Sequence, residues 1–194
     1  MTTMTRQTAL FELHKELGAK IVPFSGYDMP VWYSSIKEEH QMVRTNVGMF
    51  DISHMGVFHI SGDTAKAFIQ KISCNDINKS NDQKMIYSMV LNESGGVLDD
   101  IMVGKLEDDY VMVVNAGNKE KIWQWLDAHK TTESIQDLSG THSFIAIQGP
   151  NAIKTIKDVL NIDCTDQPRF GVKNHKIESV GSELNIVMRT GYTG

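Results

Sequence analysis

Apolar side chains near the start of the chain recur with helical spacing in two segments. Residues 5–17 carry them every three or four positions and are followed by Gly18, which predicts a short amphipathic helix. Residues 35–47 indicate a second helix, whose early turns hold two glutamates that favour the positive end of the helix dipole. Residues 21–33 contain two prolines and a glycine, so we expect a loop with short extended pieces there.

Apolar and polar residues alternate through the middle of the chain, which predicts β-strands. Three of these runs are joined by the short turns NESGG and EDD, so we expect them to pair in antiparallel. Two further segments have helical spacing and begin at residues that favour helix starts. The expected strands are residues 56–61, 84–91, 97–106 and 110–114, and the expected helices are residues 63–72 and 115–129.

Two segments share one design, VFHISGDTAKAFIQKI at residues 57–72 and SFIAIQGPNAIKTIKDVL at residues 143–160. Each has an alternating strand, a glycine-containing turn and a helix with alanine three residues after the glycine. Such units favour an α+β fold of the ferredoxin-like split βαβ type, although the shared pattern is short and leaves true repetition open. Residues 174–194 indicate two strands around a Gly-Ser turn, and the ending T-G-Y-T-G looks cut rather than finished.

The segment NESGGVLDDIMV, residues 92–103, places two adjacent carboxylates inside an apolar run. Successive side chains of a strand point to opposite faces, so Asp99 and Asp100 each lie among apolar neighbours on a different face. A carboxylate on a buried apolar surface is costly unless it is paired or hydrogen-bonded. One interpretation places both near the strand end, exposed or bonded to turn N–H groups, and the other gives one of them a reaction that develops positive charge.

Composition and charge exclude several classes of protein. The net charge of -5 and the pI of about 5.8 argue against a sequence-independent nucleic-acid binder, which needs clustered Lys and Arg. No apolar run approaches a membrane span, and the amino terminus lacks the features of a signal or transit peptide, so we expect a cytoplasmic protein with no membrane association. Neither Cys74, Cys164 nor any of the histidines has the spacing of a metal ligand set, so we expect no metal.

Six stretches carry the remaining signal. They are FSGYDMPVWY (24–33), IKEEHQMVRTNVGMFDISHMG (36–56), YSMVLNESGGVLDDIMV (87–103), VVNAGN (113–118), AIQGP (146–150) and RTGYTG (189–194). Together they resemble the T-protein family of the glycine cleavage system, the aminomethyltransferases, in the family's own order from near residue 20 to the last residue. The pair FDISHMG and GGVLDD is specific, whereas AIQGP alone would be weak.

The resemblance implies that an aminomethyl group on the lipoyl arm of the H-protein loses ammonia and passes its one-carbon unit to tetrahydrofolate. It also implies that Asp100 is the catalytic aspartate, beside the reactive pterin nitrogens, and that Asp99 is structural. A fixed carboxylate would favour an iminium-like cationic transition state and could orient or accept a folate proton. The residues expected to line the folate pocket are Tyr87, Val113, Asn115 and Tyr192.

The resemblance further implies a discontinuous first domain of residues 1–51 and 141–194, incomplete at its C-terminal end, with a second domain of residues 52–140 inserted in it. The family's third domain, which supplies an arginine, is absent, so the activity of these residues alone stays open. One alternative is a truncated, non-catalytic folate-binding fragment. Another is the folate domain of a dimethylglycine or sarcosine dehydrogenase, against which the lack of a G-x-G-x-x-G fingerprint counts. Folate-binding relatives in iron–sulfur assembly carry K-G-C-Y-x-G-Q where this chain has RTGYTG.

Overall fold

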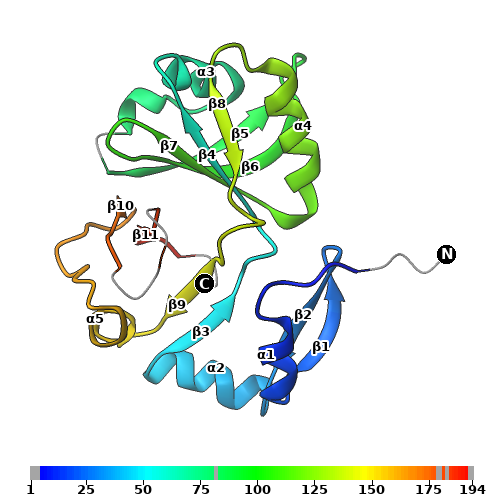
Figure 1. Ribbon diagram of the computed structural model, residues 1–194, viewed down its shortest axis with the longest axis vertical. Helices are drawn as coiled ribbons and strands as arrows, with labels where there is room; N and C mark the ends of the chain where they lie inside the picture. Colours follow the sequence, from blue (N-terminus) through cyan, green and yellow to red (C-terminus); the bar gives the residue numbers. More distant parts are fainter. Residues whose placement is uncertain (1–4, 81–82, 178–180, 182–183, 192–194) are drawn as a thin grey trace. The chain divides into compact units, whose positions relative to one another are not determined.

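The computed structural model describes residues 5–80, 83–177, 181 and 184–191. The chain forms two compact units (Figure 1). The first unit comprises Met1–His54 and Thr141–Cys164, and the second comprises Met55–Gly140 and Thr165–Gly194. Both units are discontinuous, because the chain leaves the first unit, returns to it and leaves it again.

The first unit is built from two small antiparallel sheets and three helices. Strand β1 pairs with β2 as a hairpin. Strand β3 pairs with β9, which comes much later in the chain. The expected helix at residues 5–17 is shorter than predicted, while the expected extended pieces at residues 21–33 are confirmed as the hairpin. The elements are α1 (Phe11–Glu16), β1 (Lys20–Phe24), β2 (Tyr27–Trp32), α2 (Ile36–Thr45), β3 (Gly48–Asp51), β9 (Ile145–Gln148) and α5 (Ala152–Leu160).

Local chemistry explains two boundaries in this unit. Ser35 caps α2, because its side-chain oxygen accepts the backbone N–H of Glu38 at 3.2 Å. The β1–β2 hairpin turns at Ser25 and Gly26, whose φ angles are 48° and 81°. Two consecutive positive φ values match the twist of a two-residue hairpin turn, and glycine adopts them without strain. The turn therefore fixes the register of the two strands.

The second unit holds a five-stranded antiparallel sheet with the strand order β5-β6-β7-β4-β8. The predicted strands and helices of the middle region are confirmed, with the last helix preceded by a short 3-10 turn. A separate two-stranded sheet pairs β10 with β11. The elements are β4 (Gly56–Ser61), α3 (Ala65–Ile72), η1 (Ile77–Lys79), β5 (Met85–Leu91), β6 (Val97–Lys105), β7 (Tyr110–Val114), η2 (Ala116–Asn118), α4 (Lys119–His129), β8 (Ser134–Asp137), β10 (Val172–Asn174) and β11 (Ile186–Met188).

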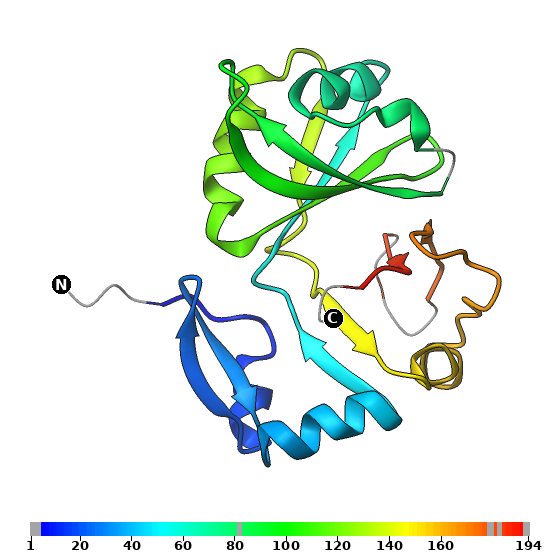
Figure 2. The same ribbon diagram turned by 180° about the vertical axis from the view of Figure 1, so that it is seen from behind.

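The main core lies between one face of this sheet and the helices α3 and α4, which Figure 2 shows from behind. Phe58 and Met112 from the strands, Ile69 from α3, and Ile122 and Leu126 from α4 are fully buried in it. Burying each such side chain contributes roughly 1.5–3 kcal/mol. This packing holds the strands that carry the predicted site residues.

The mixed α and β architecture with antiparallel sheets agrees with the expected class. The two strand-turn-helix segments, however, are β4–α3 and β9–α5, and their strands belong to different sheets. The ferredoxin-like arrangement that their similarity suggested is therefore not confirmed. Each segment packs with its own sheet, because a short shared pattern specifies local structure but not the partner strand.

Candidate functional site

The candidate site centres on β6, where the sequence places two adjacent carboxylates. Asp100 lies opposite Met89 of β5 and Asp99 lies opposite Val90, so their side chains leave opposite faces of the sheet. Asp99 shares the face of the core residue Ile101 and is only 4% exposed, whereas Asp100 is exposed to solvent. Strand alternation thus separates a buried carboxylate from an accessible one.

Amide groups that follow β7 satisfy the buried carboxylate of Asp99. Its Oδ2 accepts the backbone N–H of Asn115 at 3.1 Å. Its Oδ1 accepts hydrogen bonds from Nδ2 of Asn115 at 3.0 Å and from Nδ2 of Asn118 at 2.6 Å. These bonds replace the water that the carboxylate loses on burial, a loss that is costly when nothing compensates for it.

Asn115 connects the two carboxylates. Its Nδ2 also lies 2.8 Å from Oδ1 of Asp100 and 3.2 Å from the backbone oxygen of Asp100. The residue can reach both because it follows Val114, which lies opposite Ile101 in the β6–β7 pairing. The exposed carboxylate of Asp100 is therefore held by an amide donor that is itself held by Asp99.

Tyr87 lies beside Asp100 on the same face of the sheet. It is on β5 opposite Met102, two positions along the strand from the partner of Asp100. Desolvation raises the pKa of the Tyr87 phenol, and the charge of the Asp100 carboxylate together with a hydrogen bond to it raises that pKa further. The phenol therefore keeps its proton, and Tyr87 remains 52% exposed next to the carboxylate.

Val113 lies on the same face, on the strand that pairs with the other side of β6. It is buried and lies on β7 in the row across the sheet that includes Tyr87 on β5. The structure thus brings Asp100 and Asn115 into direct contact and places Tyr87 and Val113 in the next row on the same face. Tyr192, the other residue expected to line the pocket, lies outside the described residues.

This group of residues suits a planar ligand that carries N–H donors and a developing positive charge. Asp100 offers an accessible acceptor, the exposed ring of Tyr87 offers a stacking surface, and Val113 adds apolar surface. Among the described residues, no group of three or more His, Cys, Asp or Glu is placed to hold a metal ion.

Sequence reasoning missed Asn118 at this site. It donates to Asp99 across 19 positions of sequence, and only the pairing of β6 with β7 brings the two residues together. A usable signal was the recurrence of asparagine at Asn115 and Asn118, immediately before a helix, because asparagine at such positions commonly uses its side chain for a hydrogen bond. Lys121 adds a further tie, since its Nζ donates to the backbone oxygen of Leu98 at 2.6 Å.

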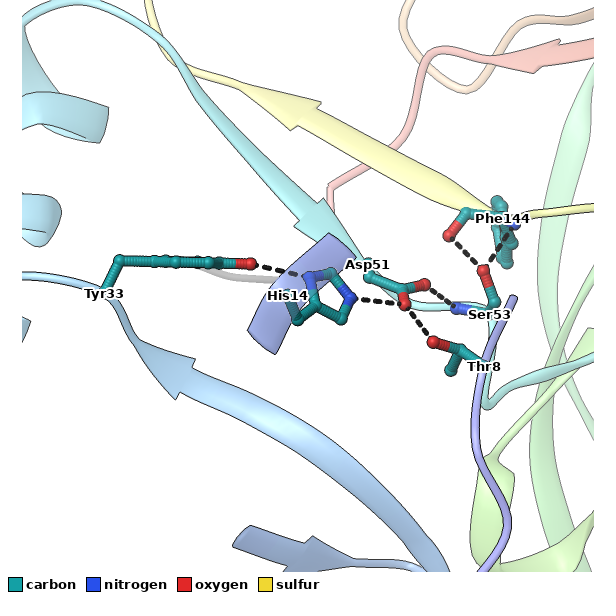
Figure 3. A network of polar contacts seen from close by, with 6 residues as sticks. All are labelled: Thr8, His14, Tyr33, Asp51, Ser53 and Phe144. Atoms are coloured by element: carbon teal, nitrogen blue, oxygen red, sulfur yellow. Dashed lines mark hydrogen bonds and ion pairs between the residues drawn. The ribbon is translucent and has the colours of Figure 1, made fainter. Parts of the chain in front are cut away.

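A second polar network, also missed from the sequence, lies in the first unit (Figure 3). The side chain of Asp51, at the end of β3, is only 1% exposed. Its Oδ2 accepts hydrogen bonds from Nε2 of His14 at 2.9 Å and from the hydroxyl of Thr8 at 2.6 Å, and its Oδ1 accepts the backbone N–H of Ser53 at 2.9 Å. The hydroxyl of Tyr33 lies 2.8 Å from Nδ1 of His14 and completes the chain of contacts.

The charges in this network favour a structural role. Burial raises the pKa of Asp51, but hydrogen bonds from His14, Ser53 and Thr8 outweigh that effect and hold the pKa below its usual range. Burial and the negative charge of Asp51 raise the pKa of Tyr33, so its phenol keeps its proton and is a poor nucleophile. The network therefore braces α1, the end of β2 and β3 against one another.

None of the helices in the described part of the chain has the length and apolar character that a membrane span requires.

Comparison with known proteins identifies relatives over nearly the whole chain. The family described as "GCVT N-terminal domain" matches residues 10–194. The aminomethyltransferase of Flavobacterium psychrophilum is 44% identical over 191 residues, which are 97% of this chain and 52% of that protein. The aminomethyltransferase of Thermotoga maritima is 41% identical over 192 residues, with the same coverage of 97% and 52%.

A solved structure shows the same similarity in three dimensions. The crystal structure of glycine cleavage system aminomethyltransferase T from Bartonella henselae superimposes with a TM-score of 0.86 at 28% identity. The match covers 97% of this chain and 51% of that chain. The chain therefore spans about half the length of the relatives that it matches.

Proposed function

Because the chain belongs to the GCVT N-terminal domain family, we propose that it provides the folate-binding part of a glycine cleavage aminomethyltransferase, with Asp100 as the catalytic residue. The observation that carries the proposal is the pair of contacts at Asp100. Its exposed carboxylate is tied to the Asn115 amide at 2.8 Å, and Tyr87 lies beside it on the same face of the sheet. The relatives' names, aminomethyltransferase, support the reaction class.

The proposed role of Asp100 follows from the charge that the reaction develops. The one-carbon unit moves as an iminium-like cation, and a fixed carboxylate lowers the free energy of such a transition state without reorganising at that moment. The same oxygen atoms can accept a proton from an attacking folate nitrogen. Asn115 supplies a hydrogen-bond donor that limits where the carboxylate can lie, and Tyr87 lies beside it. The aminomethyl donor is a lipoylated carrier protein, the H-protein, and the acceptor is tetrahydrofolate.

The remaining parts of the proposal concern location and domain structure. A cytoplasmic location fits a folate-dependent reaction on a soluble carrier. The division into a discontinuous domain of residues 1–51 and 141–194 and an inserted domain of residues 52–140 stays a prediction. A folate-binding fragment without turnover is the second candidate, and it is favoured by the coverage of only about half of each relative.

Calorimetric titration of tetrahydrofolate into the 194-residue chain tests the proposal. We expect the wild type to bind and Asp100→Asn to bind about tenfold or more weakly, because hydrogen bonds to a charged group contribute roughly 1.5–3 kcal/mol. Asp108→Asn is the matched control, since Asp108 is an exposed aspartate in the turn between β6 and β7, at the other end of the strand from the site. A folded wild-type chain that does not bind tetrahydrofolate would contradict the proposal.

Turnover separates the two candidate functions. If the chain transfers the one-carbon unit from the carrier, Asp100→Asn should lower the rate by about 100-fold or more, which is the usual size of a general acid–base contribution. Binding of tetrahydrofolate without any transfer by the wild type would favour the non-catalytic fragment. Equal transfer rates for the wild type and Asp100→Asn would remove Asp100 from the catalytic role.

A further inference from the structure

Two asparagines in the second unit occupy helix-start positions but do not cap the helices. Asn115 precedes η2 and Asn118 precedes α4, and asparagine is common there because its side-chain oxygen accepts a helix N–H. Neither side chain makes such a bond. Both direct their Nδ2 groups to Asp99 instead. The local capping interaction is thus replaced by contacts with a carboxylate on another strand.

The carboxylate of Asp99 determines how these amides are oriented. An ionised carboxylate can only accept hydrogen bonds, so each amide must present its NH₂ group and not its oxygen. The backbone N–H of Asn115 holds the second carboxylate oxygen at 3.1 Å and fixes the plane of the group. Because Asp99 is only 4% exposed, water competes little for these positions.

The orientation of Asn115 has a direct consequence for Asp100. The Asn115 NH₂ group carries two hydrogens, of which one serves Asp99 at 3.0 Å and the other serves Asp100 at 2.8 Å. If the amide turned over, its oxygen would face the Asp100 carboxylate and two acceptors would repel each other. Asp99 therefore decides whether the accessible carboxylate meets a donor or an acceptor.

We propose that Asp99, supported by Asn118, is a positioning residue that holds the Asp100 carboxylate in its reactive place through the Asn115 amide. The inference rests on the role of Asp100 in the proposed function. It gives the buried aspartate a task beyond packing, although Asp99 touches neither folate nor the reacting atoms in this scheme. It also explains why two adjacent carboxylates occur on β6, one exposed and one buried.

A loss of stability alone does not test this role, because any buried hydrogen-bonded carboxylate supports the fold. The first measurement therefore follows the Asn115 side-chain amide in the ¹⁵N-labelled chain by NMR at neutral pH. In the wild-type background, Asp100→Asn should shift the NH₂ signals, because that NH₂ group lies 2.8 Å from Oδ1 of Asp100, and this shift is the response that is compared. In the Asp99→Asn background the same change at Asp100 should give no response, because the new carboxamide can donate to the Asn115 oxygen and turn the amide so that its NH₂ group no longer faces Asp100. An unchanged response in Asp99→Asn would overturn the proposal.

A second variant covers the case in which Asp99→Asn does not fold. Asn118→Ala removes one hydrogen bond from Asp99 and does not touch Asp100 directly. It should weaken the same NMR response, and a response equal to that of the wild type would count against the proposal. Glu133→Gln is the control, because Glu133 is a buried carboxylate of the same unit that accepts the backbone N–H groups of Thr131 and Thr132. It should leave the Asn115 signals as they are.

A double-mutant cycle on tetrahydrofolate affinity gives the functional readout. Asp99→Asn should weaken binding about tenfold, which is about 1.4 kcal/mol, in the wild-type background. It should weaken binding little further in the Asp100→Asn background, because it acts through Asp100. The same factor in both backgrounds would show a merely structural role. If the wild type binds no tetrahydrofolate, the proposed function fails, and the NMR response still decides whether Asp99 positions Asp100.

Discussion

Single carboxylates in this chain differ in burial and in hydrogen-bond partners. Asp51, Asp99 and Glu133 are buried or nearly so and are satisfied by hydroxyl, imidazole or amide donors. Asp100 has the same chemistry but lies on the exposed side of its strand. Its position next to a buried partner combines accessibility with restraint, and that combination is what the proposed catalytic role requires.

The Asp51 network predicts an acid-sensitive first unit. The folded-state pKa of Asp51 lies below its usual range, so the network contributes stability above the unfolded-state pKa of about 3.8 and loses it as the pH falls toward the folded-state value. At neutral pH, Asp51→Asn should destabilise the unit by about 1–3 kcal/mol, since buried donors lose their acceptor. Urea denaturation at several pH values measures this, and the gap between wild type and variant should narrow below pH 3.8. A constant gap would contradict the assignment.

For a single residue, the alternation of side chains along a strand predicts which face of the sheet the side chain lies on. The sequence alone separates Asp99 from Asp100, because a strand has a fixed period of two. It does not identify Asn118 or the contact of His14 with Asp51, since these depend on chain segments that are distant in sequence and meet only on folding. The chemistry of a single residue is therefore partly visible in the sequence, and its partners are not.

At the scale of elements, four strands of the five-stranded sheet are predictable from the sequence, whereas β8 and the pairing of β3 with β9 are not. The turns NESGG and EDD join β5, β6 and β7 directly, so neighbours in sequence become neighbours in the sheet. Strand β3 pairs with β9, which begins at Ile145, and no local pattern links the two. The exposed apolar residues of α2 and α5 blur the signal further, because no residue of either helix is buried.

Gly104 of β6 tests how closely this sheet is packed. A methyl group there would collide with Sδ of Met85 and lie 3.0 Å from Cγ1 of Val172, so Gly104→Ala should destabilise the second unit by about 1–3 kcal/mol. Gly140→Ala is the matched control, because nothing lies within 4 Å of a methyl group at that position. Chemical denaturation measures both. Equal stability of the two variants would show that Met85 moves aside without cost.

At the scale of the whole molecule, exposed apolar side chains are concentrated in the first unit. Met49 on β3 is 69% exposed and Val159 on α5 is 72% exposed. Others of this kind in the first unit are Leu13, Leu17, Phe24, Val31, Tyr33, Ile36 and Met42. Surfaces of this type promote association in water.

We accordingly expect the 194-residue chain to associate as its concentration rises. Met49→Lys combined with Val159→Lys should shift it toward the monomer, because each change places a charge on the apolar surface. Sedimentation velocity over a range of concentrations measures the effect. Val97→Lys, at a residue of the second unit that is 59% exposed, serves as the control. Association that the control reduces as much as the double variant does would locate the contact elsewhere.

The discontinuity of the two units also determines the order in which their sheets can form during synthesis. Gly48 of β3 pairs with Gln148 of β9, so a ribosome adds about 100 residues between the two partners. At a translation rate of roughly 5–20 residues per second, β3 stays without its partner strand for on the order of 5–20 seconds. The strands of the five-stranded sheet in the second unit all fall between Gly56 and Asp137 and can pair during that interval. The sheet that carries Asp100 can therefore form before β3 pairs with β9.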